Sequence, residues 1–172
     1  MFGRRIIILC FSLLTLSARA DRPNDPTALA VWTNEAIVAT YTYNAQNFME
    51  RQKEIAFYFT AAGWIAYSKA LNDAKIPDMV KKNAYSVNAV ATMPPQIKSL
   101  HPNYWQATMP LLVVYKNPQY LQQQTLEITL EFTTAAPGQG IRGLAITSLQ
   151  SKIVTPPCQC TAEAHPTTTT TQ

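Results

Sequence analysis

The sequence predicts an α+β protein in which N-terminal helices pack on one curved antiparallel sheet. Two observations predict this class. Between about residues 26 and 82, apolar side chains recur every three or four positions, which is typical of amphipathic helices. From about residue 85 the apolar period falls to two, which is typical of strands with one buried face. Helices first and four or five strands afterwards is the order expected of an α+β domain.

The first helix is expected to begin at Asp25 and Pro26, because proline is tolerated in the first turn of a helix. Residues 44–47 predict a bend. A second helix at 48–59 carries most of the local charge as MERQKE and ends in IAFYFT. The apolar stripe of the first helix consists of Leu29, Trp32, Ala36, Ile37, Thr40 and Tyr41.

A third helix is predicted at 60–74, with Thr60 as its N-cap. Pro77 ends or restarts the helical region, and 78–82 predicts a short helical turn. Lys69 and Asp73 mark the polar side of the third helix. Its apolar side is expected to consist of Trp64, Ile65, Tyr67, Ala70 and Leu71.

The strands begin with AYSVNAVATM, in which alternate side chains are apolar until Pro94 and Pro95 stop the pattern. Residues 96–100 predict a short strand that ends in the turn HPN. The most apolar strand is 104–115, and Pro110 inside it indicates an edge strand or a bulge.

The clearest alternation is TLEITLEFT, whose inward side chains are Leu126, Ile128, Leu130 and Phe132. A loop at 135–140 follows, and 143–151 predicts a last strand. The two faces of this strand are less distinct, which indicates a bulge or a strand covered on both sides. Because the inward side chains are Leu, Ile, Val, Met, Phe and Trp, we expect a wholly apolar interior.

The first twenty residues predict a cleaved secretory signal. Arg4 and Arg5 precede an apolar run of about 11 residues at 6–16, which is too short to cross a bilayer as a helix. The motif Ala-Arg-Ala then predicts cleavage between Ala20 and Asp21. A short uncleaved anchor is the alternative.

The mature chain is expected to lie in a bacterial periplasm, with secretion from the cell as the alternative. About 150 residues suit one domain, which we place at 21–155, followed by a disordered threonine-rich tail at 156–172. We expect no stable membrane span after cleavage. Without the three arginines of the signal, eleven basic residues face ten acidic ones, so composition gives no argument for nucleic-acid binding.

Cys158 and Cys160 remain after cleavage and stand in the segment PPCQC. An oxidising compartment favours a local disulfide between them, although so small a loop would constrain little of the unfolded chain. A thiol contact with a partner chain is the alternative. A metal role together with His165 has thin support, and we predict no metal site.

No combination of residues indicates catalysis. The sequence contains no HExxH, no GxSxG and no glycine-rich phosphate loop. His101 falls in a predicted turn, and the alternation places Glu127 and Glu131 on the solvent face of a strand. We therefore expect a protein that is not an enzyme and that binds no cofactor.

The aromatic residues of the helical half offer a different kind of site. They outnumber what one helical stripe can bury, and aromatic side chains dominate the energetics of protein interfaces. Core packing is the alternative explanation for each one singly. The candidate interface residues are Tyr41, Tyr43, Tyr58 and Trp64.

The order and spacing of five segments resemble the DotI/IcmL family of Dot/Icm type IVB secretion systems, which is related to the TraM proteins of conjugation. The segments are VWTNEAIVATYTYNAQNF, YFTAAGW, YWQATMPLLVVY, QQQTLEITLEF and GIRGLAI. The resemblance implies a periplasmic α+β roll, like the scaffold domains of simpler type IV machines. It also implies no catalysis, contacts with protein subunits of a secretion complex, and homo-oligomer formation.

The chain departs from the family in two places. The core family member has a cytoplasmic stub and a transmembrane helix, where this chain has only the removable segment 1–20. The CQC and threonine tail is the second departure. We therefore expect a soluble component or accessory protein of the secretion system. The alternative is a periplasmic ligand-binding protein or enzyme. Buried polar and ionisable groups on the concave side of the sheet would favour this alternative.

Overall fold

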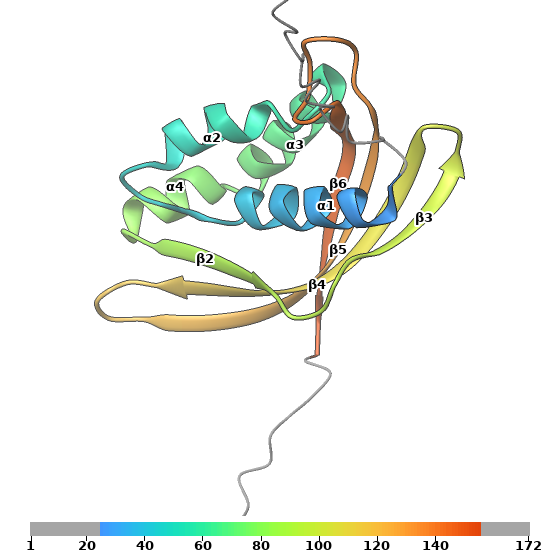
Figure 1. The fold of residues 1–172 in the computed structure, drawn as a ribbon. Helices are drawn as coiled ribbons and strands as arrows, with labels where there is room; N and C mark the ends of the chain where they lie inside the picture. Colours follow the sequence, from blue (N-terminus) through green and yellow to red (C-terminus); the bar gives the residue numbers. More distant parts are fainter. Residues whose placement is uncertain (1–24, 156–172) are drawn as a thin grey trace, which may run out of the picture.

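The computed structural model describes residues 25–155, in which four helices pack on one antiparallel sheet (Figure 1). The predicted α+β class is confirmed, and the pattern missed only a two-residue strand between the first two helices. No helix among these residues is long and apolar enough to span a membrane. The predicted signal and tail lie outside the described residues. The helices are α1 (Pro26–Thr40), α2 (Phe48–Ala56), α3 (Ala61–Asp73) and α4 (Ile76–Lys82); the strands are β1 (Tyr43–Asn44), β2 (Ser86–Ala91), β3 (Gln96–His101), β4 (Tyr104–Lys116), β5 (Leu121–Thr134) and β6 (Leu144–Val154).

The sheet has the strand order β1-β2-β4-β5-β6, and β3 pairs with β4 on the same side as β2. β2 pairs with residues 111–116 of β4, and β3 pairs with residues 104–108. Two short strands thus share the length of one long neighbour, and Pro94 and Pro95 lie between them. Figure 1 shows the helices gathered on one side of the curved sheet.

Pro110 lies in a central strand, so the prediction of an edge strand or bulge there was wrong. It pairs in regular register with Glu127 of β5. On the other side, its carbonyl accepts a hydrogen bond from the Thr92 amide at 3.1 Å. Because the N–H and C=O of a strand residue point to the same side, the missing N–H faces the gap between β2 and β3. No ladder partner is lost, and a proline is tolerated.

The last strand contains a bulge, which is one of the two alternatives that its mixed faces predicted. One of its edges is also covered. The β5–β6 register shifts next to Phe132, where β6 holds one extra residue, Thr147. Beside this bulge, the Thr60 amide donates to the Ile146 carbonyl at 2.9 Å, and the Ile146 amide donates to the Tyr58 carbonyl at 2.7 Å. The segment before α3 therefore protects the edge of β6.

The two residues predicted to begin helices, Asp25 and Thr60, are both confirmed as N-caps. Asp25 Oδ1 accepts from the Thr27 amide at 3.1 Å, and Thr60 Oγ1 accepts from the Gly63 amide at 3.1 Å. Gly63 lies directly against β6, where a Cβ would come within 2.5 Å of the Ile146 carbonyl oxygen. Glycine is needed here because only a helix without a side chain at this point can approach the strand so closely.

The close approach also explains an error in the predicted apolar side of α3. Ile65 is 69% exposed and Ala70 is exposed, although the spacing placed both on the buried side. The buried residues of α3 are Gly63 and Tyr67. The helix contacts the edge of the sheet through this narrow stripe and leaves more of its apolar surface open than a helix lying across a sheet face.

The core lies between the helices and the concave face of the sheet. Trp32 of α1 is at its centre, with its ring 5.1 Å from that of Phe132, and its Nε1–H donates to the Ile141 carbonyl at 2.9 Å. This bond joins α1 to the loop before β6. The largest fully buried side chains are Trp32, Phe132, Ile37, Ile55, Met109, Leu111, Ile128, Leu130, Ile146, Val80, Val87 and Val113.

Candidate functional site

The four aromatic residues proposed as an interface occupy different depths. Tyr43 is 7% exposed and packs edge-on against Phe48 at 5.1 Å, so it belongs to the core. Tyr41, Tyr58 and Trp64 are partly buried. A partner could reach the last three without opening the fold, whereas Tyr43 would have to leave the core. Whether these residues contact a partner stays a prediction.

Trp64 belongs to an aromatic cluster where α3 meets the end of α2. Its ring lies 5.8 Å from Phe59 and 5.7 Å from Tyr67, and Phe59 and Tyr67 are stacked at 4.9 Å. Phe59 and Tyr67 are buried, and Trp64 closes the cluster toward solvent. The core-packing explanation therefore accounts for much of the Trp64 surface but leaves part of its ring available.

Four tyrosines lie near one another between the helices and the sheet: Tyr43 and Tyr67 are buried, and Tyr41 and Tyr115 are partly buried. Strand register places Tyr43, Val87 and Tyr115 side by side on β1, β2 and β4. Burial is the main cause that raises the pKa of Tyr41 to about 12, and burial also raises the pKa values of Tyr43, Tyr67 and Tyr115. These phenols stay protonated over the whole physiological range and act as hydrogen-bond donors rather than bases.

The expectation of a wholly apolar interior was wrong. Tyrosine reads as apolar in a periodicity pattern, yet its hydroxyl brings a polar group into the core. The buried polar residues other than tyrosine are Thr33, Thr40, Gln52 and Thr125. Among residues 25–155, none of these buried groups is charged at neutral pH, so this interior offers hydrogen bonds but no acid–base pair.

A cleft of about 220 Å³ lies between α2 and α3. Gln52 is 8% exposed, and its side-chain Nε2 has no hydrogen-bond partner among the described residues. The Ser68 Oγ is likewise without a partner there. Both atoms are buried away from solvent, so the walls that the cleft presents are mainly apolar. Its lining residues, which we call the α2–α3 cleft, are Phe48, Met49, Gln52, Trp64, Ser68, Leu71, Asn72 and Pro77.

The sequence contained a signal for Gln52 that the reading of MERQKE as a charged segment overlooked. Gln52 stands four residues after Phe48 and three before Ile55, and all three are buried on one face of α2. A lone amide within an apolar stripe is the pattern that marks a buried polar group. Ser68 carried no such signal, because its place depends on how α3 packs beside α2.

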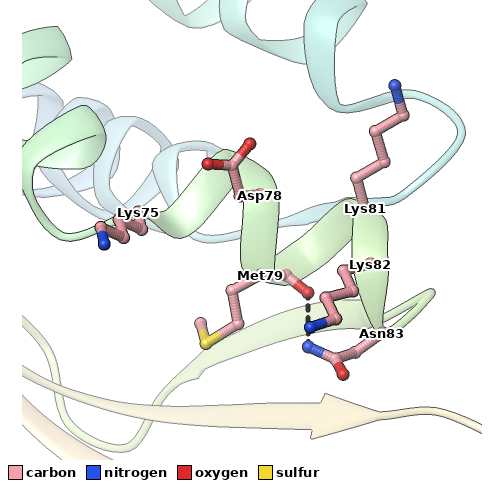
Figure 2. A pocket seen from close by; sticks show the side chains of 6 residues that line it. All are labelled: Lys75, Asp78, Met79, Lys81, Lys82 and Asn83. Atoms are coloured by element: carbon pink, nitrogen blue, oxygen red, sulfur yellow. Dashed lines mark hydrogen bonds between the residues drawn. The ribbon is translucent and has the colours of Figure 1, made fainter.

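A larger and shallower hollow of about 670 Å³ lies at α4. Figure 2 shows that its charged side chains do not converge, since Asp78 and Lys81 extend in different directions. The Asn83 side-chain amide donates to the Met79 carbonyl at 2.8 Å and is thereby occupied. The charged side chains around this hollow are therefore solvated and do not converge on one point, as the side chains of an anion-binding site would.

The acidic and histidine candidates are placed on the surface. His101 is exposed in the β3–β4 hairpin, and Glu127 is exposed on β5. Glu131 accepts hydrogen bonds from the Tyr104 hydroxyl at 2.8 Å and from the Gln106 amide at 3.1 Å. Within residues 25–155, no three His, Cys, Asp or Glu side chains lie close enough to hold a metal ion. Ala20, Asp21, Cys158 and Cys160 lie outside the described residues.

The arrangement of helices on the concave side of one six-stranded antiparallel sheet is a fold that this chain shares with solved domains of type IV secretion proteins. CagV, a VirB8 homologue of the type IV secretion system of Helicobacter pylori, shares this fold at 12% identity and a TM-score of 0.62, over 75% of this chain and 99% of that one. The periplasmic domain of DotI is more similar, with 29% identity and a TM-score of 0.70 over 77% of this chain and 98% of that one.

The chain belongs to the DotI/IcmL family. The family model for the inner-membrane complex component of the type IVb secretion system matches residues 15–152. An IcmL-like type IV secretion system protein from Legionella pneumophila is 64% identical, with a TM-score of 0.77 over 79% of this chain and 98% of that one. None of the curated proteins compared with the chain matches it. The resemblance based on the five sequence segments is confirmed.

Proposed function

We propose that the protein is a non-catalytic subunit or accessory protein of a type IVb secretion system and that it acts in the periplasm through contacts with other subunits. The observation that carries this proposal is the 64% identity to the IcmL-like Legionella protein over almost all of that chain. The family description, an inner-membrane complex component, names an assembly role. Partly buried aromatic residues and a cleft beside them supply surfaces suited to such contacts.

The location is part of the same proposal. The solved DotI domain is periplasmic, and the helices of residues 25–155 include no membrane-spanning one. We propose export through the predicted signal, with cleavage between Ala20 and Asp21. Sequencing the N-terminus of protein from a periplasmic extract tests this step. Asp21 as the first residue supports it, and a chain that still begins at Met1 contradicts it.

Crosslinking in intact cells, followed by affinity purification of the tagged full-length protein, tests the assembly role. We expect subunits of the secretion complex to be recovered together with the protein. An adduct between two copies would support the predicted homo-oligomer. Recovery of no secretion subunit, under conditions that recover a known pair of subunits from the same cells, would contradict the proposal.

A further inference from the structure

One end of the domain carries an excess of positive charge. Residues 75–83, which include α4, and residues 116–121, which form the turn between β4 and β5, together contain four lysines and one carboxylate. The rest of residues 25–155 contains six basic and seven acidic residues. We call these two segments the basic end, and Figure 1 shows α4 and the β4–β5 turn at the same end of the molecule. Its charged residues are Lys75, Asp78, Lys81, Lys82 and Lys116.

The lysines of the basic end are not neutralised locally. All four are exposed, and none makes an ion pair with a carboxylate of residues 25–155. Elsewhere in the domain, half of the basic residues pair with carboxylates, so the excess charge is concentrated at one end. The pairs are Arg51 with Glu54, Lys69 with Asp73, and Arg142 with Glu35.

Two contacts hold the segments of the basic end together. The Asn117 side-chain amide donates to the Asn83 carbonyl at 3.0 Å, which joins the turn to the end of α4. The ring of Tyr120 lies 6.2 Å from that of Tyr85, which follows α4 in the chain. Strand register also pairs Lys116 with the first residue of β2. The lysines of α4 and the side chains of the turn therefore belong to one surface.

Apolar side chains are exposed among these lysines. Leu121 is 61% exposed, Tyr120 46% and Met79 37%. Met79 precedes Lys82 by three residues and lies on the same face of α4. Leu121 is the strand partner of Lys116 and lies on the same face of the sheet. Each segment thus presents a lysine beside an exposed apolar side chain.

This combination is typical of a protein surface that lies on a membrane. Figure 2 shows that Lys75 and Lys81 extend in different directions, so they do not enclose a single anion. A membrane with anionic lipids presents many phosphates over a broad area, which diverging lysines can contact separately. Lysine side chains are long enough to hold their ammonium groups at the headgroups, while tyrosine and leucine enter the boundary with the acyl chains.

We propose that the basic end binds the surface of a membrane that contains anionic phospholipids. The lysines contact lipid phosphates, and Tyr120 and Leu121 enter the boundary between headgroups and acyl chains. Four lysines and one aspartate leave three net positive charges, which gives a reversible contact that orients the domain without anchoring it. The inference goes beyond the proposed function, which names only protein partners, and uses from it the periplasmic location.

Cosedimentation with lipid vesicles tests the inference on the exported protein purified from a periplasmic extract. We expect binding to vesicles of phosphatidylglycerol and phosphatidylcholine in equal parts, which weakens as sodium chloride is added. Binding to phosphatidylcholine alone should be far weaker. Soluble glycerol 3-phosphate should not release the protein, because one small anion does not replace a charged surface. Absence of binding to the anionic vesicles, equal binding to both compositions, or release by glycerol 3-phosphate would overturn the inference.

Two double variants locate the charged contact. Lys75→Gln with Lys82→Gln should lower the partition coefficient about 25-fold, at about fivefold for each lysine near the surface. Lys53→Gln with Lys98→Gln removes two exposed lysines of α2 and β3, and should lower it no more than about twofold. Circular dichroism establishes that both proteins are folded. An equal loss in the two proteins would overturn the placement of the contact at the basic end.

A pair of apolar variants tests insertion into the membrane. Leu121→Gln should weaken binding about fivefold, because the leucine no longer enters the boundary with the acyl chains. Ile65→Gln is the matched control, since Ile65 is 69% exposed on α3 and lies outside the basic end. It should leave binding unchanged. Equal binding by the two variants would overturn the insertion of Leu121.

A photoreactive amino acid at Tyr120 tests the contact in cells and separates a membrane from an acidic protein surface. We expect an adduct with phospholipid, detected by mass spectrometry of the purified protein. An adduct with protein alone would overturn the inference. If the tagged wild type recovers secretion subunits but does not bind anionic vesicles, the inference fails and the proposed function stands. Binding to these vesicles without recovery of any secretion subunit would support the membrane contact and contradict the proposed function.

Discussion

Replacing Gly63 with alanine would test how α3 is held against β6. The new Cβ would lie 2.5 Å from the Ile146 carbonyl oxygen and 3.0 Å from that of Thr147, so the helix has to move outward. Overpacking of this kind costs about 1–3 kcal/mol. The movement also weakens the two hydrogen bonds that join Thr60 and Tyr58 to Ile146, at about 1 kcal/mol each. Alanine restores about 1 kcal/mol through its higher helix propensity.

If both hydrogen bonds are lost, these effects combine to an expected net loss of about 2–4 kcal/mol in the free energy of unfolding. Urea denaturation followed by far-ultraviolet circular dichroism measures it. Ala66→Gly is the matched control, because it exchanges the same two residues at an exposed position of α3 and should cost about 1 kcal/mol through propensity alone. If Gly63→Ala left stability unchanged or raised it, the close approach of α3 to β6 would not exist in solution.

Three further predictions concern the core, the pH dependence and the tail. Trp32→Phe removes the hydrogen bond to the Ile141 carbonyl and part of a buried ring, so it should lower the free energy of unfolding by about 2 kcal/mol in the same assay; a neutral result would contradict the placement of Trp32. Because the pKa of Tyr41 in the folded chain is about 12 and those of three neighbouring tyrosines are also raised from 10.0, the unfolded chain loses these protons first. These groups should therefore leave the free energy of unfolding constant below about pH 10 and lower it above that pH. Ultraviolet absorbance at alkaline pH should show that some tyrosines ionise only when the protein unfolds. Ionisation of all tyrosines near their ordinary pKa in the folded protein would contradict this prediction. Thiol labelling without reductant should fail at Cys158 and Cys160, and ready labelling would argue against their disulfide.

The elements that follow from local chemistry were predictable. Asp25 and Thr60 cap helices because their side chains suit that position whatever packs around them. The alternation from Leu126 to Phe132 identifies the buried face of β5 because a strand has a fixed period of two. These predictions needed no knowledge of which element lies beside which.

The errors about Pro110 and the buried side of α3 came from neighbours distant in sequence, whereas the expectation of an apolar interior failed because tyrosine was counted as apolar. Pro110 is acceptable inside a central strand only because β2 and β3 leave a gap beside it. Ile65 is exposed because α3 packs against β6 through the face that carries Gly63, and Ile65 lies on another face of the helix. The α2–α3 cleft likewise depends on the distance between two helices, which no spacing along the chain specifies, and only the buried amide of Gln52 left a trace in the sequence.

Native fractionation of cell extracts tests most directly whether this protein works as part of an assembly. The untagged protein would be followed in cells that contain the other secretion-complex genes and in cells from which they have been deleted. We predict that it migrates within a large complex in the first cells and at the size of the free protein or a small oligomer in the second. The same migration in both, with no large complex, would contradict the account.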